Sequence, residues 1–218
     1  MTTFDRVLDD IGLAIVRGEL AGGHVDTVDG FVARTGASRS IVREATRVLV
    51  SLGMIRAGRR VGLTVLDRRE WQLLDPVVIR WRDASDDRGR QRQELRDLRR
   101  AVEGEAARLA AVARSAVHLA TLGEAIGALD RAAEARDATA FLAADRLFHA
   151  SVLAASRNAM LMRLQSVIDE ALRLRTPGTP VAWRAAPGDV RLHRDLLAAI
   201  ERNDAAAAGE IMATIANG

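Results

Sequence analysis

The sequence predicts a mainly α-helical chain, with an N-terminal unit of three helices and a small β-hairpin followed by an antiparallel bundle of about six to seven helices. Two observations lead to this prediction. Residues 1–66 combine helical periodicity with one short, glycine-punctuated stretch typical of strands. From about residue 91 the chain is rich in alanine and helical in pattern almost to its end. Such a change in composition is typical of a boundary between two domains.

The segment between the two compositions predicts a linker. Asp67 and Glu70 have the spacing of a capping box, which predicts a short helix that continues through Trp81. The polar segment 83–92 is expected to be a loop or hinge. We therefore expect three regions: a first domain over 1–66, a linker helix and hinge over 67–90, and an all-helical domain over 91–218.

The C-terminal region predicts about six helices with short connections, an arrangement that favours an antiparallel bundle. Asp137, Asp189 and either Asn203 or Asp204 are suited to cap three of these helices. The sequence TPGTP at 176–180 predicts the clearest loop. The expected helices cover residues 91–113, 116–135, 138–155, 158–175, 189–201 and 204–216.

The composition is that of an ordinary globular protein, with 49% hydrophobic and 28% charged residues. No apolar run approaches the roughly 20 residues that span a bilayer, and the N-terminus lacks the pattern of a secretory signal. We therefore expect a cytoplasmic protein without membrane contacts.

The absence of cysteine excludes disulfides and thiolate metal sites. All 32 basic side chains are arginine, and a net charge of +3 does not by itself predict nucleic-acid binding.

Residues 27–49 hold the most informative pattern of the first domain. They predict a short helix, a turn at Gly36, and a second helix with Ser38 as its N-cap. In the second helix Val42, Ala45 and Leu49 recur at helical spacing and predict one buried stripe, which Leu52 continues. The opposite face is polar and basic, with Arg39, Ser40, Arg43 and Arg47. The first residues of a recognition helix reach bases and phosphates in the major groove, so this face predicts DNA contact.

Residues 55–65 predict a β-hairpin whose tip carries Arg59 and Arg60, as in a wing that contacts backbone phosphates. The alternative is an amphipathic helix whose outer face is merely solvated. The order of turn, cap, basic helix face and basic hairpin favours a winged helix-turn-helix that binds double-stranded operator DNA.

The same residues resemble a known family. ASRSIVREA at 37–45 closely matches the signature V-S-R-T-P-V-R-E-A of the GntR family of transcriptional regulators, and LGMI at 52–55 also fits. The resemblance implies operator contacts by the second helix, assisted by the wing. Two departures are that Asp29 replaces an arginine that contacts DNA in many relatives, and that Arg60 replaces the usual wing glycine. The expected DNA-binding set is Arg34, Ser38, Arg39, Ser40, Arg43, Arg47, Arg59, Arg60 and Gly62.

Three residues of the C-terminal region have the chemistry of metal ligands. Asp145 and His149 lie four residues apart on one face of a predicted helix, and His193 lies on a later helix. Two imidazoles and a carboxylate on facing helices suit Zn, Ni or Mn, or form a polar cluster that binds an anionic ligand. Such Asp/His pairs are also common without a function, so spacing alone leaves these alternatives open.

These residues, with Asn158, resemble the FCD-type effector domain of the fatty-acid-regulator branch of the GntR family. The resemblance implies a helical bundle in which one aspartate and three histidines hold a divalent metal that helps to bind a carboxylate effector. The expected third histidine, 22 positions after His193, is Ile215 in this sequence. A three-ligand site can still hold a metal, so we expect binding that is weaker than with four ligands.

Residues 95–111 are similar to the first bundle helix of these domains and align Arg99 with an inward-facing arginine. A guanidinium pairs with a carboxylate through two parallel hydrogen bonds, so Arg99 is expected to anchor the effector beside Asp145, His149 and His193. An ion pair with Glu103 is the alternative, and both can hold. Residues 71–81 are similar to a W-x-L-L-D-P-x-V-x-x-W stretch of the branch that responds to sugar acids, or form a linker helix whose tryptophans dock one domain on the other.

Together these features predict a ligand-responsive DNA-binding repressor with no catalysis. One recognition helix reads too few bases for genomic specificity, so we expect a homodimer on a two-fold symmetric operator. The alternative is a metal-dependent enzyme that uses Asp145, His149 and His193. No general base and no phosphate-binding glycine loop stand out to support it. An architectural DNA-binding protein would leave the polar cluster unexplained.

Overall fold

The computed structural model describes residues 1–175 and 189–217, and its chain forms two compact units, Met1–Gln91 and Arg92–Gly218. The expected loop at 176–180 and the side chain of Asp189 lie outside the described residues. Within the described part, no helix is long and apolar enough to cross a membrane. The predicted mainly α-helical fold is confirmed.

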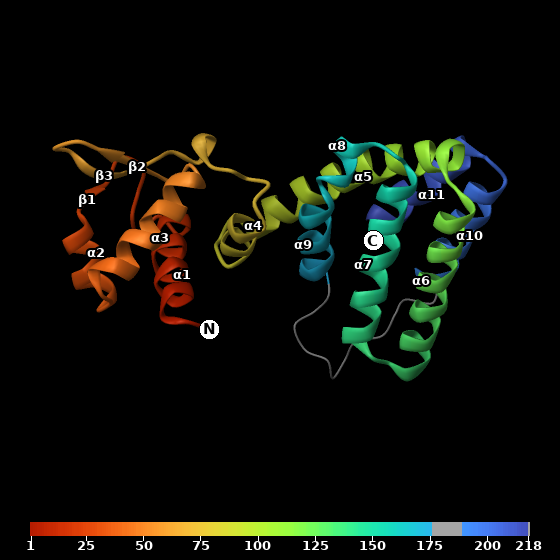
Figure 1. Cartoon of the computed structure of the whole chain (residues 1–218), viewed down its shortest axis with the longest axis horizontal. Helices are drawn as coiled ribbons and strands as arrows, with labels where there is room; N and C mark the ends of the chain where they lie inside the picture. Colours follow the sequence, from red (N-terminus) through yellow and green to blue (C-terminus); the bar gives the residue numbers. More distant parts are fainter. Residues whose placement is uncertain (176–188, 218) are drawn as a thin grey trace. The chain divides into compact units, whose positions relative to one another are not determined.

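Residues 1–66 of the first unit contain three helices and a small antiparallel sheet (Figure 1). The sheet has the strand order β1-β3-β2. The predicted hairpin is its β2–β3 pair, and β1 is an additional strand too short to show an alternating pattern in the sequence. The elements are α1 (Thr3–Val16), β1 (Val25–Asp26), α2 (Val28–Thr35), α3 (Arg39–Ser51), β2 (Ile55–Gly58) and β3 (Gly62–Val65).

Local chemistry sets the turn between α2 and α3. Gly36 ends α2 in the left-handed region, with φ of 65°, where a side chain would be strained. Ser38 then caps α3, because its hydroxyl accepts a hydrogen bond from the backbone N–H of Ile41. The predicted stripe of Val42, Ala45 and Leu49 is completely buried against the first unit's core.

The expected linker helix from Asp67 to Trp81 is wrong. Residues Arg68–Glu70 form only a short 3₁₀ turn, η1, and Asp67 makes no capping hydrogen bond. The α-helix α4 (Pro76–Asp83) begins later, where the carboxylate of Asp75 accepts from the N–H of Val77 at 2.8 Å. Proline lacks an N–H and disfavours helical geometry in the residue before it, so a helix can begin at Pro76 but cannot run through it.

The second unit is built from helices with short connections. The expected loop at 83–92 is shorter, because α4 ends at Asp83 and α5 begins at Arg88. The expected helix over 158–175 is two helices, since the N–H groups of Arg163 and Leu164 bond three residues back and break the α-helical pattern. The helices are α5 (Arg88–Ala113), α6 (Ala116–Ala135), α7 (Ala138–Ala155), α8 (Ala159–Met162), α9 (Gln165–Arg175), α10 (Asp189–Glu201) and α11 (Ala205–Asn217).

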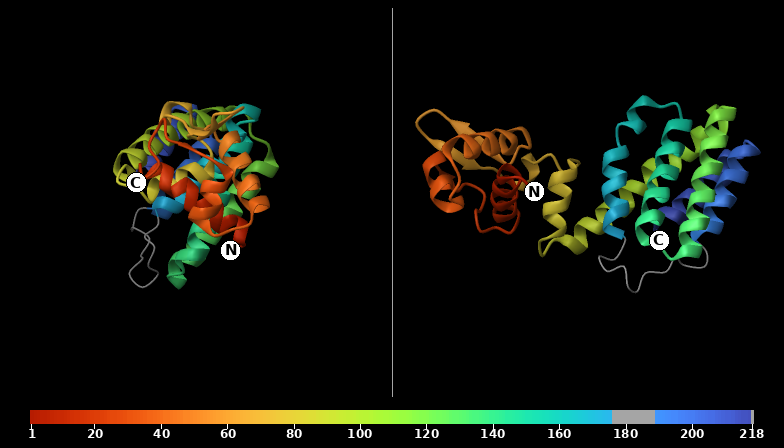
Figure 2. Two further views of the ribbon diagram at one scale, coloured as in Figure 1. Left: turned by 90° about the vertical axis from the view of Figure 1, so that its left-hand side faces the viewer. Right: turned by 60° about the horizontal axis from the view of Figure 1, so that its bottom comes forward.

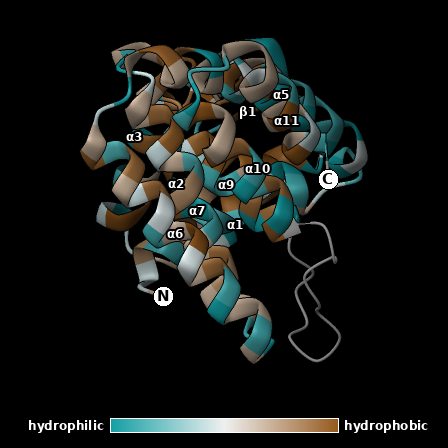
Figure 3. Cartoon of the chain, turned by 90° about the vertical axis from the view of Figure 1, so that its right-hand side faces the viewer, coloured by the Kyte–Doolittle hydropathy of each residue, from teal (hydrophilic) through white to brown (hydrophobic). Residues whose placement is uncertain are grey.

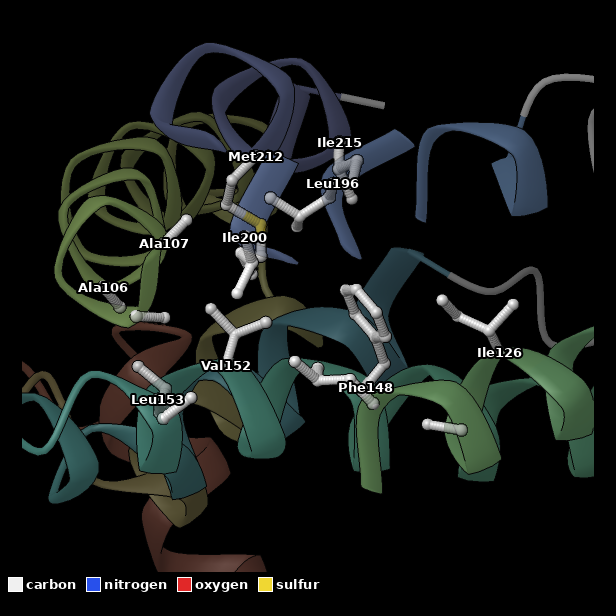
Figure 4. Close-up of a cluster of buried hydrophobic side chains, with 14 of the residues drawn as sticks. Ala106, Ala107, Ile126, Phe148, Val152, Leu153, Leu196, Ile200, Met212 and Ile215 are labelled. Carbon is white, nitrogen blue, oxygen red and sulfur yellow. The ribbon is translucent and has the colours of Figure 1, made fainter. Parts of the chain in front are cut away.

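The core of the bundle contains many alanines together with larger apolar side chains. The helices carry hydrophobic residues on one side and hydrophilic residues on another (Figure 3). Phe148 and Val152 of α7 point toward the cluster formed by Leu196 and Ile200 of α10 and Met212 of α11 (Figure 4). Helices α6 and α7 lie side by side along their lengths (Figure 2). Asp137 and Asp204 cap α7 and α11, as predicted.

Candidate functional site

The outward face of α3 carries the predicted DNA-contacting side chains. All of them are exposed, together with Arg34 at the end of α2. A hollow on this face is lined by Arg39, Ser40, Arg43, Glu44 and Arg47. Four of these five side chains donate hydrogen bonds, and three carry a positive charge. The face therefore suits a phosphate backbone and base edges.

Asp29 of α2 pairs with the first of these arginines. Its carboxylate accepts from both Nε and Nη2 of Arg39, and the Nε–Oδ1 distance is 2.9 Å. The two side chains remain 66% and 58% exposed. One arginine expected at the DNA is therefore held by a neighbouring carboxylate at the surface of the helix-turn-helix.

The tip of the hairpin carries Arg59 and Arg60, both exposed. Arg60 adopts φ of 68°, the left-handed conformation that the glycine of relatives would favour. Gly62 has φ of 97°, and a Cβ at this position would lie 2.5 Å from the carbonyl oxygen of Asp26. Gly62 therefore allows β3 to approach β1 closely, so the structure gives this residue a structural role within the sheet.

The second unit brings Asp145, His149 and His193 together. Nε2 of His193 lies 3.1 Å from Oδ1 of Asp145, and Nε2 of His149 lies 3.5 Å from the same oxygen. Each residue is at most 3% exposed. Their potential ligand atoms all lie within 4.8 Å of one another. Two facing helices, α7 and α10, thus supply one enclosed group of donors.

Arg99 and Glu103 of α5 complete this cluster. Nε of Arg99 donates to Oε2 of Glu103 at 2.7 Å, and the other oxygen of Glu103 makes a short contact with Nδ1 of His149. Nη2 of Arg99 lies 3.5 Å from Nε2 of His149. The ion pair with Glu103, an alternative at the level of sequence, is therefore present while Arg99 also reaches the histidine. The spacing of four residues was the only signal for Glu103.

The protonation of the cluster follows from these contacts. Burial raises the pKa of Glu103 and of Asp145, but the hydrogen bonds and charges of their histidine and arginine partners outweigh burial, and both pKa values are lowered. Burial opposes the charged form of His149, yet Glu103 and Asp145 raise its pKa above the ordinary value. Both carboxylates are thus held ionised inside the bundle.

Arg175 is a further member that the sequence did not reveal. Its Nη1 donates to the carbonyl oxygen of Ile215 at 3.3 Å, and its Nη2 lies 3.7 Å from Oδ2 of Asp145. Ile215 itself is buried among the apolar side chains of the bundle core. A guanidinium therefore lies between the aspartate and the backbone of the residue that replaces the expected histidine.

Next to the cluster lies a cavity of about 190 Å³ between α5 and α9. Arg99 and Arg175 line it, whereas Asp145, His149 and His193 do not. The four residues expected to bind the effector are thus close together, but of these only Arg99 lines the cavity.

Residues 94–217 match the FCD domain. The chain belongs to the GntR family of regulators that carry an FCD domain. It is 29% identical over 213 residues to the galactonate operon transcriptional repressor of Escherichia coli K12, covering 97% of this chain and 92% of the relative. It is 32% identical over 162 residues to the probable D-xylose utilization operon transcriptional repressor of Paenarthrobacter nicotinovorans, covering 74% and 63%.

A solved structure, Streptococcus agalactiae GntR, covers 98% of this GntR-family chain and 97% of its own, with a TM-score of 0.54 and 21% sequence identity. This likeness concerns the fold, a winged helix-turn-helix with a helical bundle. Membership of the family makes the chain a ligand-responsive transcription regulator.

The donor set of this GntR-family chain fits a divalent metal. With bonds of about 2.1 Å, two ligands of one ion lie roughly 3.0–3.4 Å apart, close to the separations of 3.1 and 3.5 Å around Oδ1 of Asp145. Glu103 holds Nδ1 of His149, which directs Nε2 toward the donor group. Asp145, His149 and His193 are therefore a chemically suitable three-ligand set.

Proposed function

We propose that the protein is a homodimeric repressor of the fatty-acid-regulator branch whose operator binding is controlled by a small carboxylate, a sugar acid. Residues 1–66 bind DNA, residues 67–90 link the domains, and residues 91–218 bind the effector and dimerise. The names of the two relatives, both repressors of operons for sugars or sugar acids, support this proposal. The exposed basic face of α3 supports the DNA-binding part of the proposal.

The observation that carries the effector half is the placement of Arg99. This guanidinium is 2% exposed and yet lines the cavity beside α9. A charged group is rarely buried without a partner, and Arg99 pairs with Glu103 through Nε and reaches Nε2 of His149 with Nη2. A carboxylate in the cavity would complete its hydrogen bonds in the bidentate geometry that guanidinium favours.

Asp145, His149 and His193 are the residues that would hold a divalent metal in this proposal. A bound metal would supply positive charge near the effector and lower the cost of burying its carboxylate. Glu103 orients His149 through Nδ1, and Arg175 balances the second oxygen of Asp145. The same burial, at most 3% exposure for each ligand, disfavours a metal-dependent enzyme, because a substrate would have no open side of the site to approach.

The test uses operator fragments that the wild-type protein selects from genomic DNA, with galactonate as the probe and uncharged galactitol as its control. We expect galactonate, but not galactitol, to release the DNA. Arg99→Gln should still bind the operator but should not respond. Arg100→Gln is the matched control, since Arg100 is the next residue of α5 and its side chain is 54% exposed.

Two results would contradict the proposal. Selection of no DNA would exclude a repressor, and operator binding indifferent to galactonate and gluconate would exclude control by a sugar acid. Sedimentation of the protein on its operator checks the dimer, which requires two copies for each two-fold site.

A further inference from the structure

Arg175, the last residue of α9, contacts one of the candidate metal ligands and also lines the cavity. Helix α9 packs against α7, which brings this guanidinium to Asp145 (Figure 1). Its Nη2 lies 3.7 Å from Oδ2 of Asp145, and its Nη1 donates to the carbonyl oxygen of Ile215 at 3.3 Å. The side chain is 27% exposed and forms part of the cavity wall. Arg175 is therefore placed to bind a molecule in the cavity and to act on Asp145.

The two oxygens of Asp145 have different neighbours. Oδ1 lies 3.1 Å from Nε2 of His193 and 3.5 Å from Nε2 of His149, so it is the oxygen that would bind a metal together with the two imidazoles. Oδ2 faces the guanidinium of Arg175. These three residues are at most 3% exposed, so solvent screens a neighbouring charge only weakly. A cation at Oδ2 reduces the negative charge that Asp145 offers to a metal, and it also repels the metal.

A molecule in the cavity would contact arginines and not the candidate metal ligands. Arg99 and Arg175 line the cavity, whereas the three ligands do not. Arg99 donates to Glu103 at 2.7 Å, but Arg175 approaches Asp145 only to 3.7 Å, beyond the range of a hydrogen bond. Of the two arginines, Arg175 therefore has the weaker hold on its carboxylate partner. An anion in the cavity can compete for it through charge-assisted hydrogen bonds.

We infer, on the basis of the proposed function, that Arg175 makes metal binding by Asp145, His149 and His193 depend on an anion in the cavity. Without an anion, the guanidinium stays at Oδ2 of Asp145 and keeps the affinity for the metal low. A carboxylate in the cavity accepts hydrogen bonds from Arg175, offsets its charge and raises that affinity. The anion thus favours the metal through an arginine that lies between them, and it needs no bond to the metal.

Nickel titrations of the full-length protein by calorimetry, without any sugar acid, test the effect of the charge. Arg175→Gln should bind Ni²⁺ at least about tenfold more tightly than the wild type, within the range by which neighbours of metal ligands change affinity. Arg175→Lys keeps a positive charge and should remain close to the wild type, which a purely structural role would not predict. Arg173→Gln is the matched control, because Arg173 is on the same helix, pairs with Glu170 and is 42% exposed.

The same titrations in the presence of galactonate test the effect of the anion. Galactonate should tighten Ni²⁺ binding by the wild type about tenfold and should have no such effect on Arg175→Gln. Galactonate binds Ni²⁺ in solution equally in every sample, so this contribution cancels between wild type and variant. Uncharged galactitol should change neither affinity. Thermal melting checks that each variant is folded.

Two results would overturn the inference. One is equal Ni²⁺ affinity of the wild type and Arg175→Gln, including no binding by either. The other is a wild-type affinity that galactonate leaves unchanged. In both cases, release of operator DNA by galactonate would leave the proposed function intact, whereas operator binding indifferent to galactonate and gluconate would contradict the proposed function itself.

Discussion

Removal of the carboxylate at Asp29 changes the charge of the face that we propose to contact DNA, without touching the core. In Asp29→Ala, Arg39 loses the partner that now accepts from its Nε and Nη2. The two side chains are 66% and 58% exposed, so the ion pair contributes no more than about 1 kcal/mol to the free energy of unfolding. We therefore expect the melting temperature to change little.

The effect on DNA binding should be larger. One more arginine becomes available to a phosphate, which steepens the slope of log K against log salt by about 0.9 and raises non-specific affinity roughly three- to tenfold at 0.1 M salt. Fluorescence anisotropy with random-sequence DNA over a series of salt concentrations measures both quantities.

Asp130→Ala is the matched control for Asp29→Ala. Asp130 also pairs with an exposed arginine, Arg194, but lies in the second unit. The two variants change the net charge equally. A slope in Asp29→Ala equal to that of the wild type, or an equal change in both variants, would refute a local role for Asp29 and Arg39.

Three further predictions follow from the same structure. Arg43→Ala should weaken operator binding by about 1–3 kcal/mol in a gel-shift titration with unchanged thermal stability; full retention of affinity would mean that α3 is not the reading element. Gly62→Ala should melt at a clearly lower temperature than Gly23→Ala, because both glycines have positive φ but only Gly62 would place a Cβ against backbone, 2.5 Å from Asp26 O; equal melting temperatures would speak against this steric argument. Glu103→Gln should lower Ni²⁺ affinity about tenfold or more in calorimetric titration, since its carboxylate orients His149; an identical titration would exclude that role.

Local patterns in the sequence were sufficient for the helix-turn-helix. The structural effects of Gly36, of Ser38 and of the stripe from Val42 to Leu49 extend over only one or two helical turns. Such local effects can be predicted from neighbouring residues in the sequence. The start of α4 is also encoded locally: Pro76 constrains the helix start more strongly than the capping-box spacing at Asp67, which forms no capping hydrogen bond.

The bundle site was only partly predictable. Asp145 and His149 share a helix face, so their proximity follows from helical geometry. The approach of Arg175 to Asp145 and to the backbone of Ile215 joins residues 30 and 40 positions apart, and the carbonyl contact depends on no side chain of Ile215. Such contacts arise from helix packing, which leaves no local pattern in the sequence. Strand β1 was not predicted for a similar reason, because its two residues form a strand only through their antiparallel pairing with β3.

Arg175 would couple a ligand bound in the proposed effector cavity to the internal packing of the bundle. Its guanidinium contacts α7 through Asp145 and α11 through the carbonyl of Ile215, and it also lines the cavity. A ligand that takes hydrogen bonds from this side chain competes with both helices for it. By thermodynamic linkage, the free energy with which those contacts oppose the ligand equals the free energy by which the ligand weakens the contacts. One side chain therefore gives the bundle a reciprocal coupling between what fills the cavity and how firmly α7 and α11 are joined.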